Sequence, residues 1–241
     1  QTASPAINPV TKYNPMSKAQ TQRSITAVLL AALALSAQAA DRTWDGGDTT
    51  PNPNWSAILN WDGDTSAPVN GDNLIFMGGS QTVNNNDIAG LSPGWVLFDS
   101  PGFEVSGASL ALSAGITNSV NANGATVWLG LALGAAQSFV SDSGALIISS
   151  PSTNSNYALT LDGAGNFAFS NKFVWSGASS LTKNGSGTVS LLGFTGSTLG
   201  TGTTGTNITI NNGVLELNSG YFNASPFGFG AINAVVNSGG T

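Results

Sequence analysis

The chain has 241 residues, of which only 7% are charged, with 6 Lys and Arg against 12 Asp and Glu. It contains no His and no Cys, which excludes a Ser-His-Asp triad, a thiol nucleophile and a Cys/His zinc site. The net charge of -6 argues against nucleic-acid binding, which needs clustered Lys and Arg. With 31 glycines and 41% hydrophobic residues, the composition indicates a folded, turn-rich, all-β secreted protein rather than a disordered chain.

The first element expected along the chain is a secretory signal peptide over residues 16–39. Lys18 and Arg23 form its basic start, an apolar run covers residues 25–35, and residues 37–39 read Ala-Gln-Ala, the small-residue pattern that signal peptidase cleaves. A transmembrane helix is the alternative, but it needs about 20 apolar residues and this run is shorter. We interpret Met16 as the initiator, so residues 1–15 are expected to be an unstructured upstream leader.

Residues 40–76 are predicted to form a tryptophan-rich N-terminal cap. Trp44, Trp55 and Trp61 lie in this region, and a hydrophobic cap would cover the end of a solenoid, where unpaired strand edges would otherwise face water. The alternative interpretation is that the three rings form a platform on which carbohydrates stack.

The same region contains a group of acidic residues: Asp45, Asp48, Asp62, Asp64 and Asp72. Calcium prefers hard oxygen ligands, but neither an EF-hand loop nor a G-G-x-G-x-D repeat is present. Asp and Gly are typical of turns, because Asp caps backbone amides and Gly supplies positive φ. We therefore expect turns here, and no metal or other cofactor.

Residues 77–241 are predicted to be β-helix repeats, with the last repeat truncated. Short stretches alternate apolar and small or polar residues, as strands do. Residues 162–167 match residues 184–189, and residues 208–213 match residues 234–239. Turn glycines recur at intervals of about 17 to 28 residues, which is typical of one solenoid coil per repeat. These glycines are Gly107, Gly124, Gly144, Gly163, Gly185, Gly213 and Gly239.

Two all-β architectures compete for these repeats. An antiparallel sandwich would need a turn about every 8 to 12 residues. A single-stranded parallel β-helix, or β-solenoid, pairs each strand with its copy in the next coil, so like charges at equivalent positions would repel. Because the β-helix explains both the repeats and the scarcity of charge, it is the predicted fold class.

Residues 181–193 read LTKNGSGTVSLLG. This segment resembles the autotransporter-associated β-strand repeat, whose units read L-T-K-x-G-x-G-T-L-x-L-x-G, followed by a Thr/Gly-rich stretch and an N-G-G-x-L-x-L strand. The tryptophan-rich opening and residues 131–139 are also similar to such proteins, so the resemblance covers most of residues 41–241. The linker between residues 193 and 207 is longer than the family pattern, and a translocator barrel would have to lie beyond residue 241.

The resemblance implies a non-catalytic structural or adhesive passenger, secreted or displayed on a bacterial outer surface after Sec export. We expect no enzyme activity and no catalytic residues. The expected partners are surface glycans or host matrix components, with no nucleic acid, no membrane span in the mature part, and end-to-end self-association. The alternative is a carbohydrate-binding or polysaccharide-degrading β-helix protein whose catalytic part lies outside this sequence.

Two further patterns suggest sites but fit simpler roles better. Glycoside hydrolysis needs paired carboxylates, for which Asp142 with Asp162 and Asp87 with Asp99 are the candidates. After residue 39, however, the cations available to hold an acidic sugar are Arg42, Lys172 and Lys183, so we expect turn roles instead. An ice-binding array needs threonines aligned coil after coil, whereas Thr201, Thr203, Thr204 and Thr206 lie in one linker.

Overall fold

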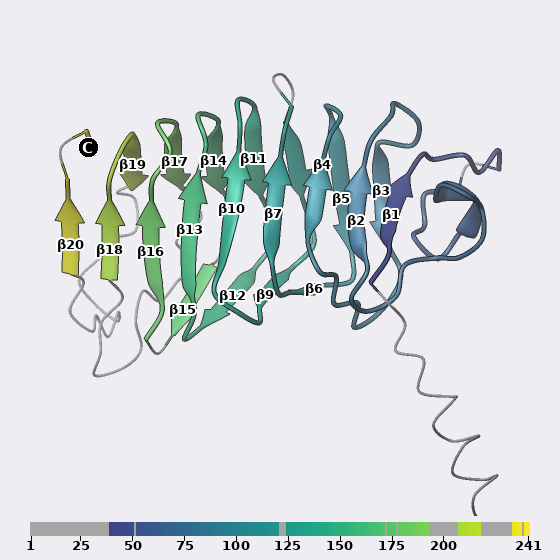
Figure 1. Cartoon of the computed structure of the whole chain (residues 1–241), viewed down its shortest axis with the longest axis horizontal. Coiled ribbons are helices and arrows are strands. Elements are labelled where there is room, and N and C mark those ends of the chain that lie inside the picture. The colour runs from purple at the N-terminus through teal and green to yellow at the C-terminus, as the bar shows by residue number, and fades with distance from the viewer. Residues whose placement is uncertain are drawn as a thin grey trace, which may run out of the picture. The chain divides into compact units, whose positions relative to one another are not determined.

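The computed structural model describes residues 39–50, 52–120, 124–171, 173–176, 178–192, 207–217, 233–237 and 239–241. In these residues the chain forms a parallel β-solenoid, because each ladder joins a strand to its counterpart one coil further along (Figure 1). This confirms the predicted fold class and excludes the antiparallel sandwich. The predicted leader and all of the predicted signal peptide except Ala39 lie outside the described residues.

Sheet A is the longest of three parallel sheets in the described residues, and its strands lie side by side in one row (Figure 1). In spatial order its strands are β1 (Asp41–Trp44), β2 (Asn73–Phe76), β4 (Val96–Phe98), β7 (Gly115–Asn118), β10 (Gln137–Ser141), β13 (Ala158–Asp162), β16 (Ser180–Lys183), β18 (Asn207–Ile210) and β20 (Asn233–Val236). Strands β1 and β2, which fall inside the region predicted as the cap, are therefore already part of the solenoid.

Sheets B and C form the other two sides of the coils. Sheet B consists of β3 (Val83–Asn86), β5 (Phe103–Gly107), β8 (Ala125–Val127), β11 (Ala145–Ile148), β14 (Asn166–Phe169), β17 (Thr188–Leu191) and β19 (Val214–Leu217). Sheet C consists of β6 (Leu110–Leu112), β9 (Leu131–Leu133), β12 (Ser152–Ser155) and β15 (Phe173–Ser176). One short 3-10 helix, η1 (Ile58–Asn60), lies between β1 and β2.

The register between coils matches the repeats found in the sequence. Phe167 pairs with Val189 and Ile208 pairs with Ala234, so both of the predicted internal matches are confirmed. Hydrogen bonds between equivalent positions span 22 residues from Asn166 to Thr188. They span 27 residues from Asn184 to Asn211, because this coil includes the long linker.

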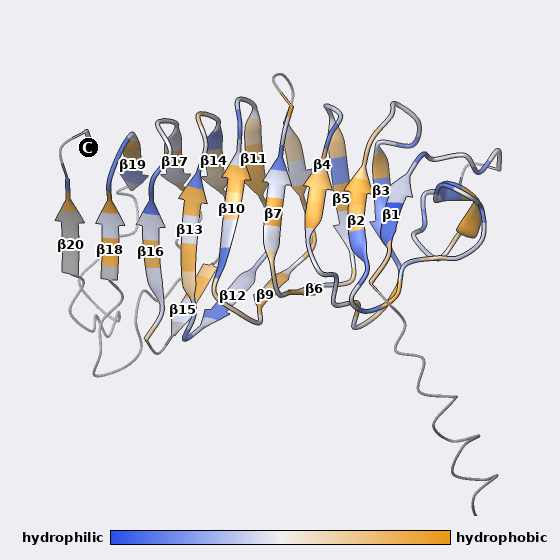
Figure 2. Ribbon diagram, in the orientation of Figure 1, coloured by the Kyte–Doolittle hydropathy of each residue, from blue (hydrophilic) through white to orange (hydrophobic). Residues whose placement is uncertain are grey.

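Apolar side chains fill the interior in columns that run from coil to coil. Along sheet A, inward-facing residues alternate with outward-facing ones, as the bands of hydropathy in β2, β10 and β13 show (Figure 2). Burial of such columns is the main favourable term in folding, at roughly 25 cal/mol for each Å² of apolar surface. One buried column, joined by successive pairings, is Leu74, Val96, Ile116, Phe139, Leu161, Lys183 and Ile210.

Charges in the described ladders always pair with uncharged neighbours, as the β-helix interpretation requires. Asp162 pairs with Val140, and Glu104 lies between Val83 and Thr126. Since side chains at paired positions of adjacent strands lie close together, two like charges there would repel. The remaining charged members of the ladders, each opposite neutral residues, are Asp41, Arg42, Lys183 and Glu216.

The motif of residues 181–193 contains one strand, one tight corner and the next strand. Strand β16 enters the corner at residues 184–187 and β17 leaves it. A Cβ at Gly185 would lie 1.9 Å from the carbonyl oxygen of Gly163, and one at Gly187 would lie 2.0 Å from that of Gly165. Glycine is needed here because the backbone of the preceding coil occupies the space. Gly107 differs from the other predicted turn glycines, because it ends a strand of sheet B.

Replacement of Gly185 by Ala tests this close approach. We expect Gly185→Ala to lower the free energy of unfolding by about 1–3 kcal/mol, because the coils must move apart to accept the methyl group. Gly79→Ala is the matched control, since a Cβ there meets nothing within 4 Å. Urea denaturation of both variants measures the difference, and equal stability of the two would contradict the packing of this corner.

Candidate functional site

The three tryptophans of the predicted cap are buried. Trp44 and Trp61 meet edge to face with their ring centroids 5.2 Å apart, and Trp55 packs 5.3 Å from Phe76. The indole Nε1 of Trp55 donates to Asn84 Oδ1 at 2.8 Å, and that of Trp61 donates to the Trp55 carbonyl at 2.8 Å. Because all three side chains are at most 1% exposed, the carbohydrate-platform interpretation is wrong for these rings. The three rings belong to the hydrophobic core, as the cap interpretation expects, and that residues 40–76 form a separate cap stays a prediction.

The cap continues into the solenoid interior through phenylalanines. Phe76 stacks on Phe98 with centroids 5.2 Å apart, and it lies 5.5 Å from Phe103. Aromatic pairs of this kind stabilise by about 0.5–1.5 kcal/mol beyond the surface that they bury. The tryptophans and the first coils therefore share one core.

Asp72 is a structural anchor rather than an open ligand. Its carboxylate is 1% exposed and accepts from Arg42 Nε at 2.8 Å. It also accepts from the Ala40 amide at 2.9 Å and the Val69 amide at 3.1 Å. Burial by itself raises the pKa of Asp72, but the hydrogen bonds from Arg42, Ala40 and Val69 outweigh it and hold the pKa below 3.8. The carboxylate thus ties the start of β1 to the turn before β2.

Two other acidic residues of the cap region have the predicted turn role. Asp45 Oδ1 accepts from the Gly47 amide at 2.9 Å. Asp48 Oδ1 accepts from the amide of Thr50 at 3.0 Å and from its hydroxyl at 2.7 Å. These side chains satisfy local backbone donors, as Asp does in turns.

The remaining acidic residues of this group, Asp62 and Asp64, are exposed in the segment that follows η1. Asp64 adopts a φ of +49°, a left-handed conformation that Asp tolerates better than most residues. Across the part of the chain that the structure describes, no three or more His, Cys, Asp or Glu side chains gather where they could hold a metal ion.

The carboxylates considered for hydrolysis also have turn or loop contacts. Asp87 accepts from the amide of Ser56 at 2.8 Å and from its hydroxyl. Asp99 accepts from the Ser119 hydroxyl at 2.6 Å. Asp162 accepts from the amide of the next residue at 2.7 Å, and Asp142 is exposed directly after β10.

Lys183, one of the cations counted from the sequence, points into the solenoid. Its side chain is only 2% exposed, and its Nζ donates to the Gly185 carbonyl at 2.5 Å. Burial lowers the pKa of this ammonium from 10.5, while the nearby Asp162 carboxylate raises it in part. Lys183 therefore binds a backbone carbonyl of the corner from the interior of the solenoid. It cannot reach a sugar carboxylate on the outer surface. Of the other two cations, Arg42 is paired with Asp72, and Lys172 lies outside the described residues, as do the linker threonines.

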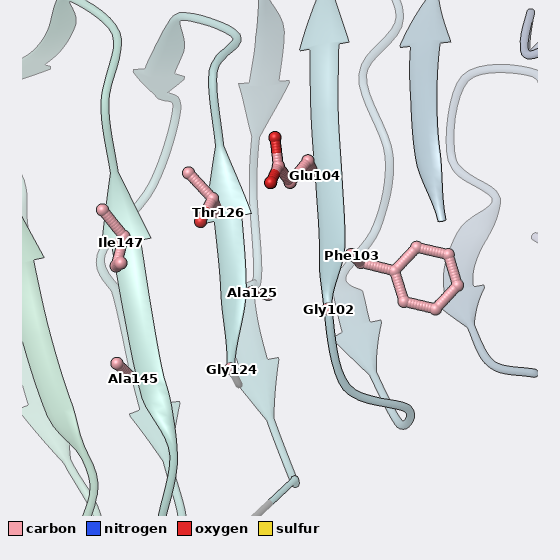
Figure 3. Close-up of a pocket in the computed structure, with 8 residues that line it drawn as sticks. All are labelled: Gly102, Phe103, Glu104, Gly124, Ala125, Thr126, Ala145 and Ile147. Atoms are coloured by element: carbon pink, nitrogen blue, oxygen red, sulfur yellow. The ribbon is translucent and has the colours of Figure 1, made fainter. Parts of the chain in front are cut away.

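A hollow of about 310 Å³ lies on the outer face of sheet B, across β5, β8 and β11. Figure 3 shows its construction: Glu104, Thr126 and Ile147 stand on three neighbouring strands, beyond the small residues at the strand starts. We call it the sheet B hollow. Its floor carries almost no side chain, because successive coils place Gly102, Gly124 and Ala145 at the same position. Phe103 and Ala125 also line it.

Trp128 directly follows β8, two residues beyond Thr126, and is not one of the residues that line the hollow. In the run from Ala125 to Trp128, burial alternates, so Trp128 faces outward on the same side as Thr126. The side chain is 50% exposed. Trp128 was not among the predicted site residues, although the alternation of Ala125, Thr126, Val127 and Trp128 already places the ring on the outer face.

A scan against protein-family models, a search of curated proteins and a search of solved structures found no match to this chain. Among the described residues there is also no helix long and apolar enough to cross a membrane.

Because Asp72 is paired with Arg42 and its pKa is lowered, we expect the free energy of unfolding to depend on pH in the acid range. Because its pKa is lower in the folded than in the unfolded chain, the unfolded chain binds more protons between the two values. The stabilisation is complete above the unfolded value near 3.8 and is lost as the pH falls through the folded value. We expect Asp72→Asn to lower the free energy of unfolding by about 1–3 kcal/mol at pH 7. In urea denaturation, the stability of this variant should also fall less than that of the wild type as the pH is lowered.

Asp64→Asn is the matched control, because it removes one acidic charge from an exposed position of the same region. It is expected to change the free energy of unfolding at pH 7 by less than about 0.5 kcal/mol. An Asp72→Asn variant as stable as this control at pH 7, with the wild-type acid profile, would contradict the anchoring role.

Proposed function

We propose that the chain is a non-catalytic structural or adhesive passenger segment of a secreted or surface-displayed bacterial protein. The observation that carries the proposal is the neutral parallel stack. In the described residues, a chain with few charges builds three parallel sheets whose ladders pair no two charges. Such a scaffold presents surface residues coil after coil and needs no cofactor to do so.

The physics of the solenoid suits a protein that folds after export. Each coil contacts its neighbours, so folding can begin at one coil and propagate along the stack. The chain contains no Cys and therefore needs no disulfide formation outside the cell. The buried tryptophans pack against Phe76 in the first coils, from which stacking can proceed.

The resemblance to the autotransporter-associated repeat supports the same role. Its most specific segment, residues 181–193, covers the end of β16, the corner and β17. In this position Gly185 and Gly187 of the motif lie against the backbone of the preceding coil. The buried ammonium of Lys183 donates a hydrogen bond to the Gly185 carbonyl in the corner. The motif thus has a structural purpose in a stacked coil, which is what a display scaffold requires.

The sheet B hollow supports a role without hydrolysis. Glycoside hydrolysis uses two carboxyl groups on either side of the scissile bond, whereas Glu104 is the one acidic residue among those that line the hollow. The competing role, polysaccharide degradation by a part outside this sequence, is distinguished by assay.

Expression from Met16 in a Gram-negative host tests the display role. We expect the protein to leave the cytoplasm with an N-terminus at Ala40, because residues 16–39 have the charge and hydropathy pattern of a signal peptide. Cell fractionation and N-terminal sequencing measure this result. A variant that starts after residue 39 should stay in the cytoplasm, and Ala39→Phe should block cleavage.

Retention of the complete chain in the cytoplasm, uncleaved, would contradict the proposal. The exported protein is then incubated with dye-labelled polysaccharides, from which we expect no release of dye. Sustained release would contradict the non-catalytic role and favour the degrading alternative.

A further inference from the structure

We propose that the sheet B hollow and Trp128 together bind a neutral or amine-bearing sugar unit of a glycan. The proposal rests on the adhesive role given above and assigns adhesion to a defined surface. The indole ring of Trp128 stacks against the C–H face of the sugar, while Glu104 and Thr126 accept and donate hydrogen bonds at its edge.

The exposure of Trp128 is the first support for this site. Trp44, Trp55, Trp61 and Trp175 are buried with at most 2% of their surface accessible, whereas Trp128 is 50% exposed. An outward indole gives up the burial that stabilises these four rings. Its Nε1–H has no hydrogen-bond partner in the described part of the chain. Half of the side-chain surface is therefore open to a ligand, and the ring N–H is not bound to another described residue.

The second support is a difference in hydrogen bonding along sheet B. Away from the hollow, polar side chains of this sheet bond from coil to coil, as when Ser190 Oγ donates to Glu216 Oε2 at 2.7 Å. The hydroxyl of Ser106 likewise donates to a backbone carbonyl of the preceding coil at 3.1 Å. By contrast, the Glu104 carboxylate and the Thr126 hydroxyl have no such partner within the described residues. These two groups line the hollow and are free to contact a ligand.

The third support is the shape of the surface. Glycine and alanine at the starts of β5, β8 and β11 leave the floor open between the wall residues (Figure 3). A side chain cannot fill it at Gly124, where a Cβ would lie 1.6 Å from the Ala145 carbonyl oxygen. The volume of about 310 Å³ is at the lower end of the range of about 300–1,000 Å³ for ligand pockets. This size suits one sugar unit of a longer chain.

Electrostatics selects the class of sugar. The one charged side chain that lines the hollow is Glu104, and the whole chain carries a net charge of -6. Uronates, sialic acids and phosphates would be repelled, because no Lys or Arg lines the hollow to pair with them. A hexose presents hydroxyl groups to the carboxylate, and a glucosamine unit adds an ammonium that pairs with it.

Binding of defined oligosaccharides to the exported full chain tests the proposal. The probes are chitosan oligosaccharides, cellulose oligosaccharides and, as the acidic comparison, oligogalacturonate, with affinity measured by titration calorimetry. We expect the first two to bind, with chitosan tighter, and oligogalacturonate not to bind. Trp128→Ala should weaken binding of both about tenfold or more, whereas Glu104→Gln should weaken chitosan binding more than cellulose binding.

Leu192→Ala is the matched control, because Leu192 is also a large apolar side chain exposed directly after a strand of sheet B. It is expected to keep wild-type affinity. Acrylamide quenching supplies a direct readout: the sugar should protect tryptophan fluorescence in the wild type and in Leu192→Ala, but not in Trp128→Ala. Equal urea midpoints of the variants check that each one folds.

Unchanged affinity of Trp128→Ala, preferred binding of oligogalacturonate, or binding of neither chitosan nor cellulose oligosaccharides would overturn the proposal. Such a failure is separable from failure of the proposed function. A chain that is exported and cleaved but binds neither sugar keeps its display role without this site. A chain retained in the cytoplasm that still binds sugar through Trp128 loses the display role alone.

Discussion

The structure depends on in-register parallel pairing between one coil and the next. Strands in such a sheet lie about 4.8 Å apart, so each side chain has the equivalent residue of the neighbouring coil directly beside it. This single constraint decides which residues are acceptable at each position: apolar ones inside, glycine where a corner approaches the preceding coil, and uncharged ones along the outer ladders. The scarcity of charge in the sequence follows from it, since each charged ladder residue lies opposite neutral neighbours.

The interior of the solenoid also accepts a few polar side chains in place of apolar ones. Asn118 and Ser141 are paired in sheet A and buried, and they bond to each other at 3.2 Å. Lys183 occupies an apolar column between Leu161 and Ile210, and its ammonium is satisfied by a corner carbonyl. The Asn118 amide nitrogen and the Lys183 ammonium each have such a bond, as most buried polar groups do. Two buried oxygens, Asn118 Oδ1 and Gln137 Oε1, have no hydrogen-bond partner among the described residues. The outer surface is then free to vary, and the sheet B hollow arises on that surface.

Much of the fold could be predicted from the sequence because its signals are local or periodic. The match of residues 162–167 with 184–189 predicted the register of β14 and β17. Sheet C as a separate third side was not predicted. The inward position of Lys183 was also missed, although Lys183 lies two residues after Leu181 and therefore on the same face of the strand. The sheet B hollow was beyond sequence reasoning, because it requires Gly102, Gly124 and Ala145 of three coils to coincide. The signal peptide and the family resemblance stay predictions.

A double-mutant cycle at Thr160 and Thr182, which pair between β13 and β16, measures the pairing between coils most directly. Both side chains face outward and neither carries a charge. With two glutamates the account predicts an unfavourable coupling of about 0.2–1 kcal/mol, and with Glu opposite Lys a favourable coupling of similar size. Coupling energies of zero for both pairs would contradict the in-register parallel stack.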